Sequence, residues 1–181
     1  VVDYENKVID GYRFDRVENN PLTITSNAAN NVMKVYYVKD NFDYTIEYYY
    51  QGVKDDSKTV TGNEVFESEV VDYENKVIDG YKFEKVENNP LTITSNAENN
   101  VMRVYYVKDN FDYSIEYYYE GSLDSSKTVT GNTVFESEVV NYENKVIDGY
   151  KFEKVENNPL VITSNPANNI TCRIYCFAVY S

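Results

Sequence analysis

The feature that most constrains this chain is an internal repeat with a period of 69 residues, from Val1 to Val70. The segment VVDYENKVIDGY begins at both positions, and VVNYENKVIDGY begins at Val139. Residues 1–69 and 70–138 differ at eleven positions, and the third copy keeps the pattern to Asn169 before it diverges into ITCRIYCFAVYS. A repeat of this length predicts tandem modules, each with a core of its own.

The differences between the first two copies indicate which positions face solvent. Arg13 becomes Lys82 and Lys34 becomes Arg103, so the charge is kept although the geometry of the cation is not. Such exchanges are typical of solvated faces. The differences within residues 51–56 change the character of the side chain, which is typical of an exposed hairpin tip.

The first half of each unit has the pattern of β-strands. Apolar residues alternate with polar ones over residues 42–50, which predicts a half-buried strand. Residues 51–57 predict a turn, and residues 58–61 and 64–70 predict two strands around a second turn at Gly62-Asn63. The face predicted to be buried carries Phe42, Tyr44, Ile46, Tyr48 and Tyr50.

The second half of the unit continues the β pattern. Residues 72–76 fit either a loop or a helical turn, and residues 81–87 predict a strand that Asn88-Asn89-Pro90 stops, because proline cannot donate to a ladder. Residues 91–94 predict a short extended segment. Residues 101–107 are apolar on both faces, which predicts a central strand. The fold class is therefore mainly β, with tandem small mixed-sheet modules.

Composition argues against several classes of function. The chain has 181 residues, a net charge of -13 and no His, so it lacks the commonest general base and the basic surface that nucleic acid requires. No segment is apolar enough to insert into a membrane, and no catalytic motif is present. We expect a protein that is not an enzyme. Its 42% hydrophobic residues still allow folded modules.

Two cysteines lie outside the repeated pattern. Cys172 and Cys176 both fall within the last ten residues. If that segment is a strand, four residues separate their Cα atoms by about 13 Å, beyond the limit of about 7 Å for a disulfide. We expect that they do not pair with each other.

Three segments carry a resemblance to a known family. The opening strand with its Thr-Gly turn, the segment IDGYKF and the closing VMRVYYVKD resemble the mucin-binding-protein (MucBP) repeats of Gram-positive surface adhesins, and more distantly the internalin B-type repeats. The resemblance implies an α+β architecture of the β-grasp type. It also implies an extracellular location on a bacterial cell wall, with host mucin or another glycan as a partner.

The phasing of that family divides the chain into three parts. Residues 1–40 are the C-terminal half of a repeat, residues 41–109 are a complete repeat, and residues 110–181 are a complete repeat with a divergent end. Because the chain begins with Val1 and shows no signal peptide, we expect it to be a piece of a longer protein.

The tyrosine triplets are candidates for glycan binding. In a strand the middle tyrosine of each triplet points away from its two neighbours, so Tyr49 and Tyr118 are the candidates for stacking on sugar rings. The alternative is cross-strand packing, which regularly pairs aromatic residues in sheets.

Acidic residues gather where one unit passes into the next. Their oxygen atoms are the ligands that calcium prefers, so a stiffening calcium ion is one hypothesis, and a solvated linker is the alternative. We expect no other cofactor. The candidate ligands are Asp40, Asn41 and Asp43, and again Asp109, Asn110 and Asp112.

Three functions fit these observations. The first is a spacer or stalk of tandem modules in a bacterial adhesin, in which neighbouring repeats contact each other. The second is a mucin- or glycan-binding module that gains avidity from repetition. The third is a self-assembling extracellular fibre, in which residues 1–40 or the strand-like tail Ile170–Tyr180 add to the sheet edge of another chain.

Overall fold

The computed structural model describes residues 4–140, 145 and 147–177. Within these residues the chain forms sixteen β-strands and five short 3-10 turns, and no α-helix. The mainly β fold class with repeated mixed-sheet modules is thereby confirmed. Residues 72–76 form a loop and not a helical turn.

Residues 4–40, here called the half-module, form a two-stranded antiparallel sheet in which Tyr12 lies opposite Lys39. A cis peptide bond joins Asn20 to Pro21 in the connection between the two strands. The elements are β1 (Tyr12–Glu18), η1 (Ala28–Asn30) and β2 (Lys34–Lys39).

Residues 41–109, here called the middle module, form a sheet with the strand order β4-β3-β9-β7, in which β5 also pairs with β3. Strand β9 runs parallel to β3, so the sheet is mixed. The elements are β3 (Asn41–Tyr50), β4 (Val53–Lys54), η2 (Asp56–Lys58), β5 (Val60–Val65), β6 (Glu69–Val70), β7 (Tyr81–Glu87), β8 (Leu91–Thr92), η3 (Ala97–Asn99) and β9 (Val101–Lys108).

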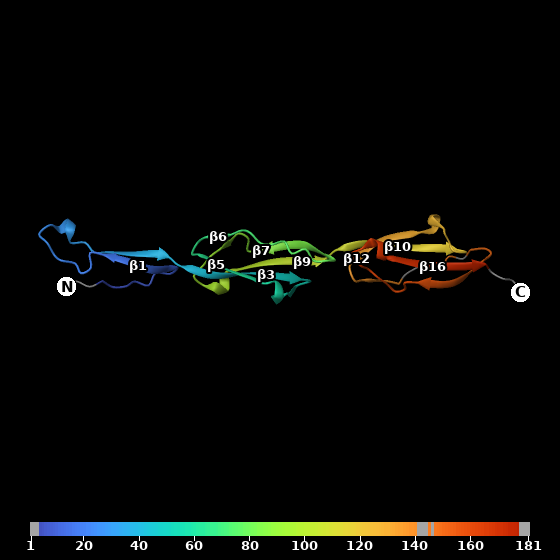
Figure 1. Ribbon diagram of the computed structural model, residues 1–181, viewed down its shortest axis with the longest axis horizontal. Helices are drawn as coiled ribbons and strands as arrows, with labels where there is room; N and C mark the ends of the chain where they lie inside the picture. Colours follow the sequence, from blue (N-terminus) through green and yellow to red (C-terminus); the bar gives the residue numbers. More distant parts are fainter. Residues whose placement is uncertain (1–3, 141–144, 146, 178–181) are drawn as a thin grey trace. The chain divides into compact units, whose positions relative to one another are not determined.

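Residues 110–177, here called the last module, repeat this topology. Strand β16 runs parallel to β10 and antiparallel to β14, and Figure 1 shows β10 and β16 side by side. The elements are β10 (Asn110–Tyr119), β11 (Ser122–Leu123), η4 (Ser125–Lys127), β12 (Val129–Val134), β13 (Glu138–Val139), β14 (Tyr150–Glu156), β15 (Leu160–Val161), η5 (Pro166–Asn168) and β16 (Ile170–Phe177).

The chain divides into two compact units. One comprises Val1–Glu74 and Glu84–Tyr105, and the other comprises Asn75–Phe83 and Tyr106–Ser181. The first unit contains the passage from β2 to β3 and the second contains the passage from β9 to β10. Each passage can therefore be described inside one unit.

The alternation predicted for residues 42–50 is confirmed. Ile46 and Tyr48 on β3 are buried, whereas Asp43 on the opposite face is exposed. Strand β7 matches the predicted span and ends before Asn88, which takes a left-handed conformation with φ 59°. Strand β9 lies between β3 and β7, as its apolar pattern predicts.

The prediction of a turn at Gly62-Asn63 is wrong. Both residues lie within β5, where Gly62 pairs with Tyr44 on β3. A Cβ atom on Gly62 would lie 2.3 Å from the Cζ atom of Tyr44, because the tyrosine ring packs on the glycine backbone. Glycine is required here by close packing and not by a turn. Gly131 and Tyr113 repeat the contact in the last module.

A buried asparagine joins the loop before β9 to β3. Asn100 is fully buried, and its Oδ1 accepts the backbone N–H of Thr94 at 2.9 Å. Its Nδ2 donates to the carbonyl oxygens of Thr94 at 2.9 Å and Asp43 at 3.1 Å. Because both ends of this buried amide are paired, the loop is held in register with the sheet. Asn169 makes the same bonds in the last module.

The half-module has no strand equivalent to β3, and its apolar residues are correspondingly exposed. Ile24 is 64% exposed, whereas its counterpart Ile93 in the middle module is 1% exposed. Asn31, the counterpart of Asn100, bonds to Thr25 through both ends of its amide and is only half-buried.

The paired asparagines give a matched test of stability. Asn100→Ala should lower the free energy of unfolding by about 2 to 3 kcal/mol, because it leaves part-buried backbone groups of two segments without partners. Asn31→Ala should cost about 1 kcal/mol or less, since its partner Thr25 is open to water. Urea unfolding followed by tyrosine fluorescence measures both, and equal losses would contradict the role assigned to Asn100.

Candidate functional site

The passage from the half-module to the middle module is built around one residue, Asp40, which alone separates β2 from β3. Its backbone N–H donates to the carbonyl of Gly11 at 2.9 Å, and its carbonyl accepts the N–H of Phe66 at 2.8 Å. We call Gly11, Asp40 and Phe66 the first junction. Since β2 continues into β3 without a flexible linker, its backbone hydrogen bonds hold the two parts together.

The same arrangement recurs between β9 and β10. Asp109 donates its N–H to the carbonyl of Gly80 at 2.9 Å and accepts from the N–H of Phe135 at 2.9 Å. We call Gly80, Asp109 and Phe135 the second junction. The two junctions are equivalent residue for residue, since each pair of positions is one period apart.

Each junction places a phenylalanine ring on a glycine. Gly80 has φ +81°, a conformation that favours glycine, and a Cβ atom there would lie 2.4 Å from the Cδ1 atom of Phe135. The ring of Phe135 also makes edge contacts with Tyr81 and Phe111, each at 6.1 Å between centroids. Phe66 packs on Gly11 in the same way.

Ion pairs flank both junctions. Lys82 lies 2.9 Å from Asp109, and the hydrogen bond that it donates lowers the pKa of that carboxyl group. Lys108 lies 2.7 Å from Glu136, and the hydrogen bond that it donates to this carboxylate raises the pKa of the Lys108 ammonium group. Both pairs are open to solvent, where water and salt screen the attraction, so neither is a main source of stability at the junction. At the first junction the pairs are Arg13 with Asp40 at 3.3 Å and Lys39 with Glu67 at 2.8 Å.

The aspartates predicted to bind calcium have other partners in the structure. The carboxylate of Asp109 accepts the backbone N–H of Asn110 at 2.8 Å in addition to its contact with Lys82, and Asp112 accepts from Asn132 at 2.6 Å. At the first junction the carboxylate of Asp40 likewise accepts the backbone N–H of Asn41 and pairs with Arg13, and Asp43 accepts from Asn63. Among the described residues, no three His, Cys, Asp or Glu side chains form a group that could hold a metal ion. Calcium at the junctions stays a prediction.

The face of the middle-module sheet that points away from the core, here called the outer face, carries a connected polar network. Glu47 lies 2.7 Å from Lys54 and 3.2 Å from Arg103, and it accepts the hydroxyl of Tyr49 at 2.9 Å. Partial burial acts to raise the pKa of Glu47, but the hydrogen bonds from Lys54 and Tyr49 outweigh it, so the pKa lies below its usual value. Its charge is therefore neutralised within the module.

This network also accounts for Tyr49, one of the two tyrosines predicted to stack on sugars. Its ring stacks on Tyr105 with centroids 4.9 Å apart, and the ammonium of Lys85 lies 4.7 Å from the centre of the Tyr105 ring. Cross-strand packing thus occupies one face of the Tyr49 ring. Glycan stacking on Tyr49 stays a prediction.

Tyr118, the equivalent tyrosine of the last module, has different neighbours. Its hydroxyl donates to Glu116 at 2.7 Å, and this hydrogen bond, together with burial, raises the pKa of Tyr118 to about 12. Ile174 lies opposite Tyr118 where the middle module has Tyr105, so the stacked pair is not repeated. Glycan stacking on Tyr118 likewise stays a prediction.

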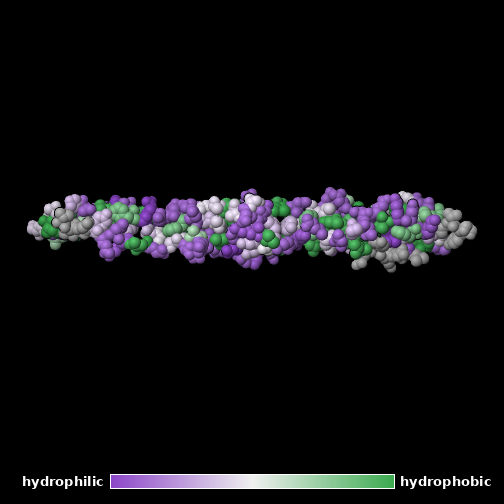
Figure 2. Space-filling view, turned by 90° about the horizontal axis from the view of Figure 1, so that it is seen from below, coloured by the Kyte–Doolittle hydropathy of each residue, from purple (hydrophilic) through white to green (hydrophobic). Residues whose placement is uncertain are grey.

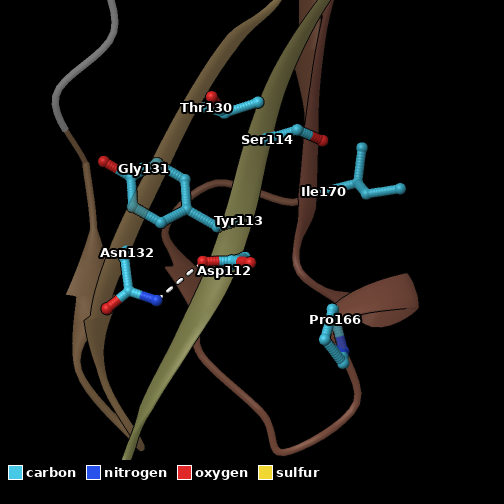
Figure 3. A pocket seen from close by; sticks show the side chains of 8 residues that line it. All are labelled: Asp112, Tyr113, Ser114, Thr130, Gly131, Asn132, Pro166 and Ile170. Atoms are coloured by element: carbon cyan, nitrogen blue, oxygen red, sulfur yellow. Dashed lines mark hydrogen bonds between the residues drawn. The ribbon is translucent and has the colours of Figure 1, made fainter.

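Both complete modules have a cleft beside the first long strand. In the last module it has a volume of about 530 Å³, and Figure 3 shows Asn132 donating to Asp112 at its edge. The equivalent cleft of the middle module has a volume of about 540 Å³ and includes the Asn63–Asp43 pair. The lining residues of the first are Asp112, Tyr113, Ser114, Thr130, Gly131, Asn132, Pro166 and Ile170.

The cleft offers hydroxyl, amide and carboxylate groups, which can exchange hydrogen bonds with a polyhydroxylated ligand. Sequence reasoning missed it, because reading Gly62-Asn63 as a turn removed Asn63 from the strand. The recurrence of Gly-Asn at Gly131-Asn132, inside an otherwise strand-like run, was the available signal.

Polar residues predominate on the surface that Figure 2 shows, with apolar residues in small groups among them. None of the helical segments in the described part of the chain is long and apolar enough to cross a membrane. No protein-family model matches the chain, and no curated protein matches it.

Two glycines with the same backbone conformation allow the junction packing to be measured. Gly80→Ala should lower the free energy of unfolding by about 2 to 4 kcal/mol, because it adds a clash with Phe135 to the cost of a left-handed alanine. Gly52→Ala, at φ +77° with nothing within 4 Å, should cost only about 1 kcal/mol. Thermal unfolding measures both, and similar losses would argue against packing at the junction.

The raised pKa of Tyr118 predicts a late titration. NMR titration of ¹³Cζ-labelled tyrosine should show Tyr118 ionising near pH 12, and Glu116→Gln should move that pKa towards 10. Since the folded pKa is raised, the hydrogen bond stabilises the fold fully below pH 10 and is lost as the pH rises through 12. Ionisation of Tyr118 near pH 10 in the unaltered protein would refute the contact.

Proposed function

We propose that this chain is a non-catalytic spacer, made of tandem modules of the MucBP type, from a bacterial cell-surface adhesin. The observation that supports this most is the recurrence of the junction. Gly11, Asp40 and Phe66 make the same contacts as Gly80, Asp109 and Phe135.

The junction has the properties that a spacer needs. Flexible linkers between domains are rich in Gly and Ser, whereas here a single aspartate separates two strands. Its N–H and C=O both bond to the flanking modules, so bending at this point would break hydrogen bonds and expose a phenylalanine. Each added repeat brings a further copy of the same junction, so length changes without redesign.

Binding of mucin or another glycan is the second candidate, and the cleft found in both complete modules favours it. Two equivalent weak sites on one chain would act together through effective concentration. An array of host glycans probed with the whole chain tests this candidate. A binding signal that is lost in an Asn63→Ala, Asn132→Ala double variant would support glycan binding. No binding signal above background would leave the spacer as the remaining candidate of the two.

Assembly into a fibre by strand addition is the least supported of the three predicted functions. Strand β16 lies between β10 and β14, so both of its edges are already paired. The last residues of the predicted tail, 178–180, lie outside the described residues. Strand addition through residues 1–40 stays a prediction.

Distance measurement between modules tests the spacer. Spin labels at Val53 and Ser122, the equivalent exposed first residues of β4 and β11, should give one narrow distance distribution in a background with Cys172→Ser and Cys176→Val. Phe135→Ala should broaden it by removing the packing at the second junction. A broad distribution in the protein with Phe135 intact would overturn the proposal.

A further inference from the structure

Strand β2 of the half-module has only one of its two edges paired. It pairs with β1 alone, whereas its counterparts β9 and β16 each lie between two strands of their sheets. In both complete modules the second edge is covered by the first long strand, β3 or β10, which runs parallel to it. No strand in the described part of the chain takes that place beside β2.

The half-module around this free edge is preformed. The hydroxyl of Tyr37 on β2 accepts the backbone N–H of Lys7 at 2.7 Å and donates to the Oδ1 atom of Asn6 at 3.1 Å. Tyr106 on β9 makes the same two bonds one period later. The half-module therefore keeps the backbone arrangement of a complete module at this point, although no first long strand is paired with it.

Apolar side chains at the start of β2 are incompletely covered. Met33 and Val35 are only half-buried, whereas their counterparts Met102 and Val104 are fully buried in the middle module. Val32 beside them is 45% exposed. Because burial of apolar surface favours association, the half-module offers a surface that the first half of a repeat covers in the complete modules.

The loop before β2 lacks, among the described residues, two hydrogen bonds that its counterpart makes to β3. In the middle module the carbonyl of Asn100 accepts the N–H of Thr45 at 2.9 Å, and its Nδ2 donates to the carbonyl of Asp43 at 3.1 Å. The side-chain amide of Asn31 bonds within the described chain only to Thr25, in its own loop. A strand added in the register of β3 restores both bonds.

Lys34 is a cation at this edge without an acid beside it. It is exposed and forms no ion pair in the part of the chain that the structure describes. Its counterpart Arg103 lies 3.2 Å from Glu47 on β3. The first half of the last module carries an acid at the same position, Glu116. A strand that adds to β2 therefore meets a complementary charge if it has an acid here.

These observations identify the occupant of the edge by its chemistry. It is an extended segment with apolar residues at alternate positions, as Ile46 and Tyr48 are buried on β3, and with an acid between them, as Glu47 is. A second copy of the chain offers no such free segment, because its β3 and β10 are already paired with β9 and β16. The occupant is therefore the first half of a repeat on a different polypeptide.

We propose that the half-module is a binding site for a segment with the pattern of a repeat's first half, supplied by a separate polypeptide. The segment adds to the free edge of β2 as a parallel strand, with its acid beside Lys34 and its backbone bonded to Asn31. In this mode of recognition main-chain hydrogen bonds supply affinity, and side chains at alternate positions supply specificity. The binding does not depend on the spacer function, because the junctions that support the spacer consist of other residues.

NMR titration of the ¹⁵N-labelled whole chain with a synthetic peptide of residues 41–70 tests the proposal. Saturable shifts should be largest at residues 31–37, and alternate amides of β2 should exchange more slowly with solvent, because they gain hydrogen-bond partners. Absence of binding at millimolar peptide, or shifts centred on β9 or β16 in place of β2, would overturn the proposal.

A charge exchange tests the register. Lys34→Glu in the chain should weaken peptide binding by about tenfold, because two carboxylates then face each other. A peptide that carries Glu47→Lys should bind this variant with the lost affinity restored, and should bind the unaltered chain weakly. Equal affinities in all four combinations would count decisively against the proposal.

Two further variants serve as controls, and circular dichroism confirms that each altered chain folds. Lys151→Glu, at an exposed lysine of the last module, changes the net charge by the same amount and should leave peptide affinity unchanged. A peptide with Ile46→Asp should not bind, since this side chain has to be buried. Sedimentation of the chain alone adds a last check: self-association that Lys34→Glu abolishes would assign the edge to a second copy and refute the proposal.

Discussion

The parallel pairing of the first and last long strands of a module is the constraint on which the other contacts depend. In the last module β10 and β16 pair in register from Ser114 to Tyr119, although the chain travels through five other strands to join them. Such a pairing costs chain entropy, which local contacts must offset. The buried asparagine at position 169 contributes by bonding the loop before β16 to the carbonyl of Asp112.

The same constraint explains the junction. Strand β9 is central in the sheet of the middle module, and after Asp109 the chain continues directly into β10, the first strand of the last module. Any shift in its register would move Gly80 away from Phe135 and turn the following strand over, because successive side chains point to opposite faces. The glycine contact therefore depends on the register of the sheet, and it also holds that register in place.

Local patterns predicted the strands whose two faces differ. Three signals depend only on neighbours in sequence: the alternation in residues 42–50, the stop at Asn88-Asn89-Pro90 and the apolar run at residues 101–107. The structure has a strand at the first, the end of a strand just before the second, and a strand at the third. Gly62 was misread because the reason for a glycine there is the ring of Tyr44 on another strand. The pattern of neighbouring residues in the sequence does not indicate that contact.

The candidate sites were harder to predict for the same reason. Tyr49 was correctly assigned to the face away from the core, but its stacking on Tyr105 and its bond to Glu47 depend on which strands are neighbours. The acids at Asp40 and Asp109 were recognised as special, whereas their pairing with Arg13 and Lys82 required the hairpin register. The role of Phe66 and Phe135 was not predicted, since each packs on a glycine about 55 residues earlier in the chain.

Comparison of the copies separates what the fold requires from what it permits. The core of the last module accepts Arg173 where the middle module has Val104, and Arg173 is 2% exposed with its guanidinium 4.5 Å from the centre of the Phe152 ring. An aromatic ring compensates part of the cost of burying that cation. The sheet thus keeps its topology despite a charged residue in its core, so backbone pairing and the aromatic layer carry more of the specificity of the fold than any single aliphatic contact. The outer face is under still less constraint, which is why its chemistry can differ between modules while the junction stays the same.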